Sequence, residues 1–300
     1  MNNFHTPVLL KEVIEYLEVQ LGKKYIDATM GGGGHGFEIL RRGGVVLGID
    51  CDQEAIDYVK EKLKDQSSKI KANKDLILVK GNFRDIDEIA RLNGFEKVSG
   101  ILFDLGVSSY QLETPGRGFS FQKEGPLDMR MDKDLGVRAA DLINALSKKE
   151  LYELFTKMGE ERNAWAISSS IVRARRVKKI ETTRELASII EKIGGATSAF
   201  AKASADKRVF QALRIAVNDE LSSLQEALLK TIDLLDKNGR IAVISFHSLE
   251  DRIVKDSFKK FQKQGLGTIL TKKPIIAGNS EVQGNIRARS AKLRVFSARG

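Results

Sequence analysis

The sequence predicts an α/β fold, in which helices cover both faces of a mostly parallel sheet and an all-helical domain is inserted. Three observations lead to this prediction. Short apolar runs alternate with helix-period segments as far as Asp104, and a run of glycines follows the first apolar run. A long helix-rich stretch then separates the fourth apolar run from the fifth.

The chain up to Asp104 has the pattern of a helix followed by four strands with helices between them. Thr6 is placed to cap a helix that starts at Pro7 and has apolar residues at helical spacing up to Leu17. The spacing of apolar residues predicts strands near 25–27, 45–49, 76–79 and 101–103, with a helix over 55–63. Strands that alternate with helices in this way are typical of a parallel sheet.

An insertion follows the fourth strand. Roughly 135 residues separate it from a fifth strand at 241–244, far more than a usual crossover. Helix-period apolar residues occur in 151–158, 164–175, 185–193 and 209–235, and the last of these helices returns the chain to the sheet. We therefore predict a sheet domain of residues 1–112 and 213–300, with a helical domain of residues 113–212 inserted over the active site.

The end of the chain completes the sheet. A helix is expected at 249–261, followed by two short strands at 268–270 and 291–298. Their direct connection predicts an antiparallel pairing.

The stretch between the first two strands indicates a pocket for an adenosine compound. Five of the six residues from Gly31 to Gly36 are glycine, and the second strand ends at Asp50. Glycines let the backbone take positive φ and approach a ligand closely. A carboxylate about twenty residues farther on can accept hydrogen bonds from both ribose hydroxyls.

Two further carboxylates favour S-adenosylmethionine over a nicotinamide dinucleotide. The glycines satisfy the dinucleotide pattern Gly-x-Gly-x-x-Gly, but Asp27 ends the first strand, where it would repel a pyrophosphate and suit the cationic amino-acid part of S-adenosylmethionine. Asp104 ends the fourth strand, at the edge where open α/β sheets carry out their chemistry. The sequence therefore favours a methyltransferase, with a dehydrogenase as the alternative.

Several longer motifs resemble the ribosomal RNA small subunit methyltransferase H family, and the likeness runs from His5 to Arg294. They are Asp104-Leu105-Gly106-Val107-Ser108-Ser109-Tyr110-Gln111-Leu112, Arg117-Gly118-Phe119-Ser120-Phe121, residues 125–132 (Gly-Pro-Leu-Asp-Met-Arg-Met-Asp) and residues 244–252 (Ile-Ser-Phe-His-Ser-Leu-Glu-Asp-Arg). The resemblance implies a Rossmann-like class I methyltransferase fold and S-adenosylmethionine as cofactor. It also implies methylation of the exocyclic N4 amine of a cytidine in the decoding region of small-subunit (16S) ribosomal RNA.

Two other functions remain open from the residues alone. One is a DNA amine methyltransferase, which usually shows an Asp/Ser-Pro-Pro-Tyr motif where this chain has Asp104-Leu105-Gly106-Val107. The other is a non-catalytic RNA-binding factor of ribosome assembly that retains the cofactor fold.

The resemblance also implies the cofactor contacts, which are Gly33, Gly34, His35, Asp50, Phe83, Asp104 and Gln111. Phe83 follows the third strand, where an aromatic ring can lie against the adenine. Asp104 is in addition our candidate for the catalytic group that accepts the proton lost by the cytidine amine.

RNA contacts are expected mainly from the inserted domain. The candidates there are Arg117, Phe119, Phe121, Arg130 and Arg208, with the aromatic rings available to stack on an extruded base. One departure from the family lies in residues 194–208. Where relatives have His-Pro-Ala-Thr-Arg, this chain keeps only the final Arg208, and the small residues before it predict a mobile loop that puts RNA contacts there in doubt.

The net charge of +10 is unevenly distributed. Residues 257–300, which include Lys272 and Lys273, hold ten Lys and Arg against the single acid Glu281, and a second basic cluster covers 173–184. Such patches suit a polyphosphate partner, here small-subunit ribosomal RNA in an assembled or assembling ribosomal subunit.

The composition argues against a disulfide-linked, metal-binding or membrane protein. The single cysteine, Cys51, allows no internal disulfide, and the three histidines lack metal-ligand spacing, so no metal site is expected. Cys51 also follows Asp50 at the ribose end of the pocket, away from where a thiolate would attack a pyrimidine ring. No apolar run has the length of a membrane span, and the protein is expected to be cytoplasmic.

Overall fold

The structure is a computed structural model that describes residues 7–66, 75–193 and 199–300. It divides into two compact units, one of Met1–Ser108 with Leu221–Gly300 and the other of Ser109–Glu220. The sheet unit therefore ends before the predicted Leu112 and resumes at Leu221, later than the predicted Leu213. The placement of the helical domain over the active site stays a prediction.

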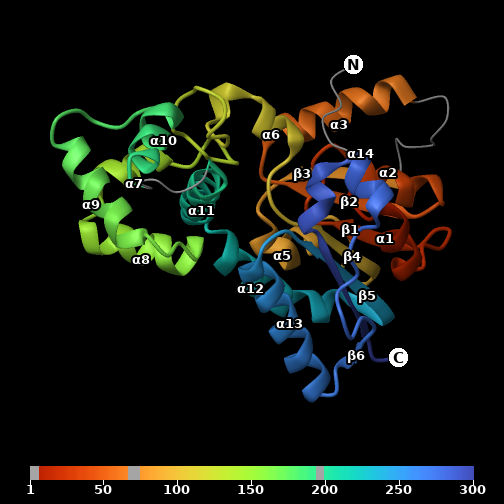
Figure 1. The fold of residues 1–300 in the computed structure, drawn as a ribbon. Coiled ribbons are helices and arrows are strands. Elements are labelled where there is room, and N and C mark those ends of the chain that lie inside the picture. Colours follow the sequence, from red (N-terminus) through yellow and green to blue (C-terminus); the bar gives the residue numbers. More distant parts are fainter. Residues whose placement is uncertain (1–6, 67–74, 194–198) are drawn as a thin grey trace. The chain divides into compact units, whose positions relative to one another are not determined.

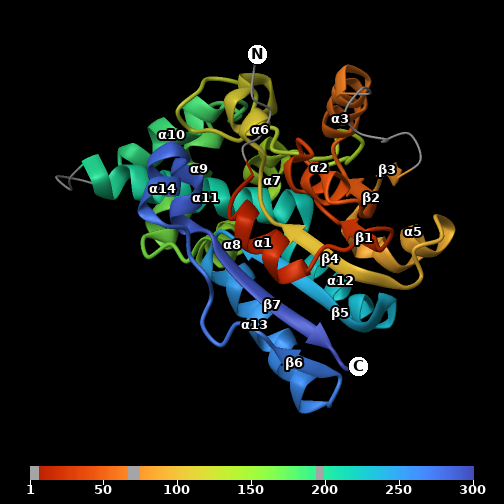
Figure 2. The ribbon, with the colours of Figure 1, turned by 90° about the vertical axis from the view of Figure 1, so that its right-hand side faces the viewer.

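A seven-stranded sheet forms the centre of the first unit (Figures 1 and 2), in the order β3-β2-β1-β4-β5-β7-β6. The strands are β1 (Lys24–Asp27), β2 (Val45–Asp50), β3 (Leu76–Lys80), β4 (Val98–Asp104), β5 (Leu235–Ser245), β6 (Gly267–Ile269) and β7 (Lys292–Ala298). The first five run parallel, whereas β7 is antiparallel to both β5 and β6. This is a Rossmann-like class I methyltransferase sheet, and the predicted fold class is confirmed.

Two helical layers cover the sheet. One contains α1 (Leu10–Leu17), α2 (Gly34–Arg41) and α3 (Gln53–Gln66), and the other contains α5 (Ile86–Leu92), α12 (Glu220–Leu234) and α13 (Ser248–Lys263). Successive strand residues point to opposite faces, so on β1 Tyr25 packs in the first layer and Ile26 in the second. Because β1, β2 and β4 run parallel, their carboxyl ends meet at one edge of the sheet, where Asp27, Asp50 and Asp104 are found.

Helix α1 starts at Leu10, and the prediction of a start at Pro7 is wrong. Leu9 takes the left-handed conformation, with φ of 53°, and its N–H donates to Glu281 Oε1 at 2.7 Å. This tie to the C-terminal part of the chain keeps Leu9 out of the helix. Thr6, the predicted cap, lies outside the described residues.

The second unit is helical, as predicted. Its elements are α6 (Ser109–Glu113), η2 (Pro115–Arg117), α7 (Ala139–Ala145), α8 (Lys148–Gly159), α9 (Ala164–Arg175), α10 (Thr183–Glu191) and α11 (Ala199–Asn218). The predicted helix over 209–235 is two helices, because Asp219 has a φ of 47° and separates α11 from α12.

The predicted mobile loop over 194–208 is wrong in part. Residues 194–198 lie outside the described residues, but the chain from Ala199 onward is the first part of α11. The small residues there are mostly alanine, the strongest helix former, which explains the helix.

The terminal strands β6 and β7 pair antiparallel as predicted. Their connection is not direct, however, because α14 (Asn279–Gly284) and η3 (Ile286–Ser290) lie between them. Ala288 of η3 is buried in the layer that contains α1 to α3.

Candidate cofactor site and catalytic carboxylate

The glycine loop between β1 and α2 provides backbone donors. Gly31 and Gly33 have φ of 48° and 77°, a conformation that side-chain-bearing residues rarely adopt. Gly33 caps α2, and the N–H groups of Gly34, His35 and Gly36 have no acceptor among the described residues. Such a helix N-terminus favours an anionic group, and the carboxylate of S-adenosylmethionine meets that requirement.

Packing within the protein explains two of the glycines. A Cβ at Gly34 would lie 2.9 Å from the ring of Pro7, and one at Gly36 would lie 2.9 Å from the end of the Met30 side chain. The explanation from the sequence, close approach to a ligand, is therefore incomplete for these two positions, because the neighbouring atoms belong to the protein itself.

Asp50 connects the end of β2 to the glycine loop. Its Oδ2 accepts the N–H of Gly31 at 2.7 Å, and its Oδ1 accepts the N–H of Asp52 at 2.9 Å. A carboxylate oxygen can accept more than one hydrogen bond, so the same oxygens are able to bind ribose hydroxyls. The fold thus holds Asp50 in a fixed orientation before any ligand arrives.

Asp104 and His35 lie together at the end of β4. Asp104 Oδ2 is 3.6 Å from His35 Nδ1, and the two side chains are only 7% and 4% exposed. The backbone N–H of Asp104 donates to Thr29 Oγ1 at 2.6 Å. His35 Nε2 lies 3.0 Å from the carbonyl oxygen of Val8, which can only accept, so Nε2 carries a hydrogen. The imidazole therefore lies between the N-terminal segment, to which it is hydrogen-bonded, and the Asp104 carboxylate.

Asp27 is the most deeply buried of the three carboxylates, and its Oδ1 accepts the N–H of Thr29 at 3.2 Å. Burial raises the pKa of Asp27 to about 6, with the charges of Asp104 and Asp50 adding to this, while His35 and the Thr29 N–H act against it. Three carboxylates at one sheet edge attract a sulfonium or an ammonium group and repel a pyrophosphate.

The two remaining predicted cofactor contacts lie on different units. Phe83 starts η1 (Phe83–Asp85), and its ring packs edge-on against Phe103 with the centroids 5.7 Å apart. The ring is half-buried and can also border a ligand. Gln111 is buried within α6, in the second unit. The assignment of both residues to the cofactor stays a prediction.

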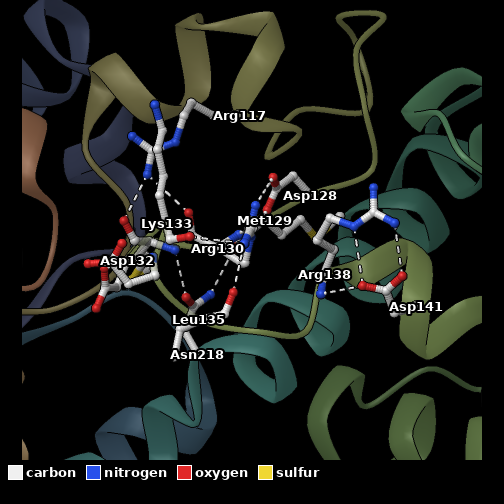
Figure 3. Close-up of polar contacts among 12 residues, drawn as sticks. Arg117, Asp128, Met129, Arg130, Asp132, Lys133, Leu135, Arg138, Asp141 and Asn218 are labelled. Atoms are coloured by element: carbon white, nitrogen blue, oxygen red, sulfur yellow. Dashed lines mark hydrogen bonds and ion pairs between the residues drawn. The ribbon is translucent and has the colours of Figure 1, made fainter.

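Two predicted RNA-binding arginines are engaged within the second unit (Figure 3). The guanidinium of Arg117 is buried and donates to the carbonyls of Arg130 and Met131 at 3.0 and 2.9 Å. Arg130 forms a two-pronged pair with Asp128 at 2.7 and 2.9 Å, and also donates to the carbonyls of Lys133 and Leu135. Both side chains thus hold the loop over 128–135 in shape.

The other predicted RNA contacts differ in exposure. Phe119 is buried, and Phe121 packs edge-on against Phe210 at 5.7 Å. Arg208 Nε lies 2.6 Å from the buried carboxylate of Glu161. Lys272 and Lys273 are both exposed. Direct RNA contact stays a prediction for all of these residues.

Sequence reasoning missed Asn218. Its Oδ1 accepts the N–H of Met131 at 2.7 Å, and its Nδ2 donates to the carbonyl of Met129 at 2.8 Å (Figure 3). These bonds hold Met129, a buried residue with φ of 64°, in the left-handed conformation. No motif marks Asn218, because its partners lie 87 and 89 residues away in the sequence.

The motif over 244–252 joins α13 to the sheet. Glu250 Oε2 accepts the N–H of Phe246 at 2.7 Å, and Asp251 pairs with Arg294 of β7 at 2.6 Å. Burial alone would raise the pKa of Asp251, but the hydrogen bond and charge of Arg294, with help from Lys292, hold it below its ordinary value.

Neither a metal centre nor a membrane helix is found in the described part of the chain. Over residues 7–66, 75–193 and 199–300, no three His, Cys, Asp or Glu side chains are grouped so that they could hold a metal ion. Within the same ranges, no helix combines the length and apolar content needed to cross a bilayer.

The model of the MraW methylase family matches residues 2–299. The chain belongs to this family. It is 46% identical to ribosomal RNA small subunit methyltransferase H of Persephonella marina, over 97% of this chain and 98% of that protein. The protein of the same name from Carboxydothermus hydrogenoformans is 44% identical, over 97% and 96% of the two chains. The chain is therefore a methyltransferase with S-adenosylmethionine as its cofactor.

Solved structures show weaker likeness. An rRNA methylase from Streptococcus thermophilus gives a TM-score of 0.46 at 13% identity, over 96% of this chain and 95% of that one. A protein from Streptococcus mutans, solved in complex with SAH, gives 0.45 at 14% identity, over 98% and 99%.

Proposed function

We propose that this methyltransferase modifies the exocyclic N4 amine of a cytidine in the decoding region of small-subunit ribosomal RNA. The observation that carries the chemistry is the Asp104 carboxylate, which stands at the carboxyl end of β4 beside the His35 imidazole. The family match over residues 2–299 supports ribosomal RNA as the substrate.

The cytidine amine is a poor nucleophile, because its lone pair is conjugated with the ring. S-adenosylmethionine supplies an electrophilic methyl group on a sulfonium. Attack by the amine forms the N–C bond while the S–C bond breaks, and the amine loses one proton. In our proposal Asp104 accepts the hydrogen bond that orients the amine and then accepts this proton.

Positioning of the reactants is the larger part of the proposed catalysis. Asp50 would hold the ribose, the N–H groups of Gly34 to Gly36 the carboxylate, and Asp27 would favour the cationic centre. Holding two reactants in line removes much of the entropic barrier of a bimolecular step. Because base pairing hides the amine, we expect the cytidine to be flipped or locally unpaired.

The test uses purified protein, labelled S-adenosylmethionine and three separate substrates: small ribosomal subunits, naked small-subunit RNA and duplex DNA. We expect label in ribosomal RNA, recovered as N4-methylcytidine after digestion to nucleosides. Label found in DNA alone would establish a DNA methyltransferase, and no label in any substrate would favour a non-catalytic assembly factor.

A variant pair tests the role of Asp104. Asp104→Asn preserves the shape of the side chain but removes its ability to accept a proton, so we expect a loss of roughly 10²- to 10⁴-fold in rate. The exposed Asp57→Asn change on α3 is the matched control and should leave the rate unchanged. Native-like turnover by Asp104→Asn would rule out this carboxylate as the proton acceptor.

Methylation at carbon 5 of the pyrimidine is the chemical alternative within RNA, and it commonly needs a thiolate. Cys51 is the single cysteine and stands directly after β2. We therefore expect Cys51→Ala to retain activity, and recovery of 5-methylcytidine would contradict the proposal.

A further inference from the structure

The single tryptophan of the chain lies on the surface of the second unit. Trp165 is in the first turn of α9 and is 56% exposed. Tyr152 of α8, 38% exposed, packs edge-on against it, with ring centroids 5.5 Å apart and planes at 83°. Helices α8 and α9 are neighbours in the fold (Figure 1). Two large aromatic rings thus form one exposed patch, an unusual use of side chains that are normally mostly buried.

A cation sits on this aromatic patch. Lys148 Nζ lies 3.6 Å from the centre of the Trp165 ring, and Lys148 forms no ion pair with any residue that the structure describes. The ring quadrupole attracts the ammonium and holds it at the patch. A ligand that covers the aromatic rings can therefore also bring an anionic group, such as a phosphate, to this ammonium.

Three acids of the second unit are paired with cations. Glu153 pairs with Lys157 at 3.0 Å, Glu161 with Arg208 at 2.6 Å, and Glu185 with Lys178 at 2.6 Å. By contrast, Arg173, Arg176 and Lys179 are exposed and form no ion pair within the described ranges. These three side chains therefore contribute unpaired positive charge to the surface of the second unit.

The aromatic patch and the arginines share one face of α9. Trp165, Ser169, Arg173 and Arg176 follow one another at steps of four, four and three residues, which places them in one row along the helix. Trp165 and Arg173 are separated by about 12 Å along the axis, at 1.5 Å per residue. A few nucleotides of extended single strand cover such a distance.

We propose that this face of α9 binds an unpaired segment of the ribosomal RNA substrate, with one base stacked on the Trp165 ring and its edge beside Tyr152. Lys148, Arg173 and Arg176 bind the phosphates on either side. Single-stranded nucleic acid is recognised by this combination of aromatic rings and a cationic track. The identity of the ligand as RNA rests on the proposed function, whereas the stacking site itself rests on the rings and charges of this unit.

Intrinsic fluorescence tests the proposal directly, because all tryptophan emission comes from Trp165. Single-stranded oligocytidylate RNA is titrated into the full-length protein, and inorganic polyphosphate serves as a control that carries charge but no bases. We expect the RNA to quench the emission in a saturable way and polyphosphate to leave it nearly unchanged. Binding of fluorescently labelled RNA without any change in tryptophan emission would overturn the proposal.

Variants extend the test. Trp165→Ala should weaken RNA binding by about 5- to 150-fold, and Trp165→Phe, which keeps a ring, should weaken it less. Val177→Ala, an exposed non-aromatic change just beyond α9, is the matched control and should have no effect. S-adenosylmethionine binding should stay as in the native protein for every variant.

Two outcomes separate this inference from the proposed function. Normal methylation of small ribosomal subunits, with RNA affinity unchanged in Trp165→Ala, would refute the stacking site and leave the function standing. RNA-dependent quenching without methyl transfer to any RNA would do the reverse. Trp165→Ala could also lose activity on ribosomal subunits while its affinity for naked RNA stays unchanged. That result would mean that the face contacts a ribosomal protein, and it would also refute the proposal.

Discussion

Asp27→Asn should change the pH dependence of stability. Burial raises the pKa of Asp27 from 3.8 to about 6 in the folded state. One pKa unit corresponds to 1.36 kcal/mol, so this shift is equivalent to roughly 3 kcal/mol. Because the folded-state pKa is raised, the stability that protonated Asp27 contributes is fully present below pH 3.8 and is lost as the pH rises through about 6.

Asparagine is close in shape to a protonated aspartate and does not ionise. Asp27→Asn should therefore keep at neutral pH the stability that the native protein loses, up to about 3 kcal/mol. Urea unfolding curves measured across the window from pH 3.8 to about 6 provide the test. The free energies of unfolding of the two proteins should diverge as the pH rises.

Asp251→Asn is the control of opposite sign. Arg294 and Lys292 lower the pKa of Asp251, so its contribution is present above the unfolded-state pKa and is lost as the pH falls through the lower folded-state value. If the free energies of unfolding of the native protein and of Asp27→Asn run parallel across this pH window, burial of Asp27 as a charged group is not what limits stability.

We also expect Asp27→Asn to weaken S-adenosylmethionine binding, because one carboxylate near the cationic centre is lost.

Three further predictions concern the ligand, the RNA and the loop. Asp50→Ala should remove two hydrogen bonds to the ribose and cost about 2–3 kcal/mol of S-adenosylmethionine affinity by calorimetry; measurable binding of a nicotinamide dinucleotide instead would contradict the cofactor assignment. Replacing the exposed Lys272 and Lys273 by Glu should raise the RNA concentration needed for methylation. It should also reduce the slope of log binding constant against log salt concentration by roughly one to two units. An unchanged salt slope would mean that the C-terminal basic segment is only a solvated surface. Asn218→Ala should cost about 1–3 kcal/mol in thermal or urea unfolding, because the Met131 N–H and the Met129 carbonyl lose their partner, and a stability equal to that of the native protein would show that the loop is held by Arg117 and Arg130 alone.

Local patterns in the sequence were sufficient for the sheet and for the edge that carries the site. The side-chain period of strands and helices marks each buried element, and the carboxyl ends of parallel strands meet at one edge. Asp27, Asp50 and Asp104 could therefore be placed together before any contact was known, and the structure has them at the ends of β1, β2 and β4. The glycine run likewise marked the turn into α2, since Gly31 and Gly33 need positive φ.

Only the tertiary structure decided how side chains far apart in the chain pair. His35 lies between Val8 and Asp104, and Asn218 holds a loop 87 residues away. Such contacts depend on how whole elements pack and not on local periodicity. Arg117 and Arg130 are a second example. The sequence shows that they are charged, but not that they donate hydrogen bonds to backbone carbonyls and to the Asp128 carboxylate. A charged side chain is assigned to a ligand or to the protein by the neighbours that folding brings to it.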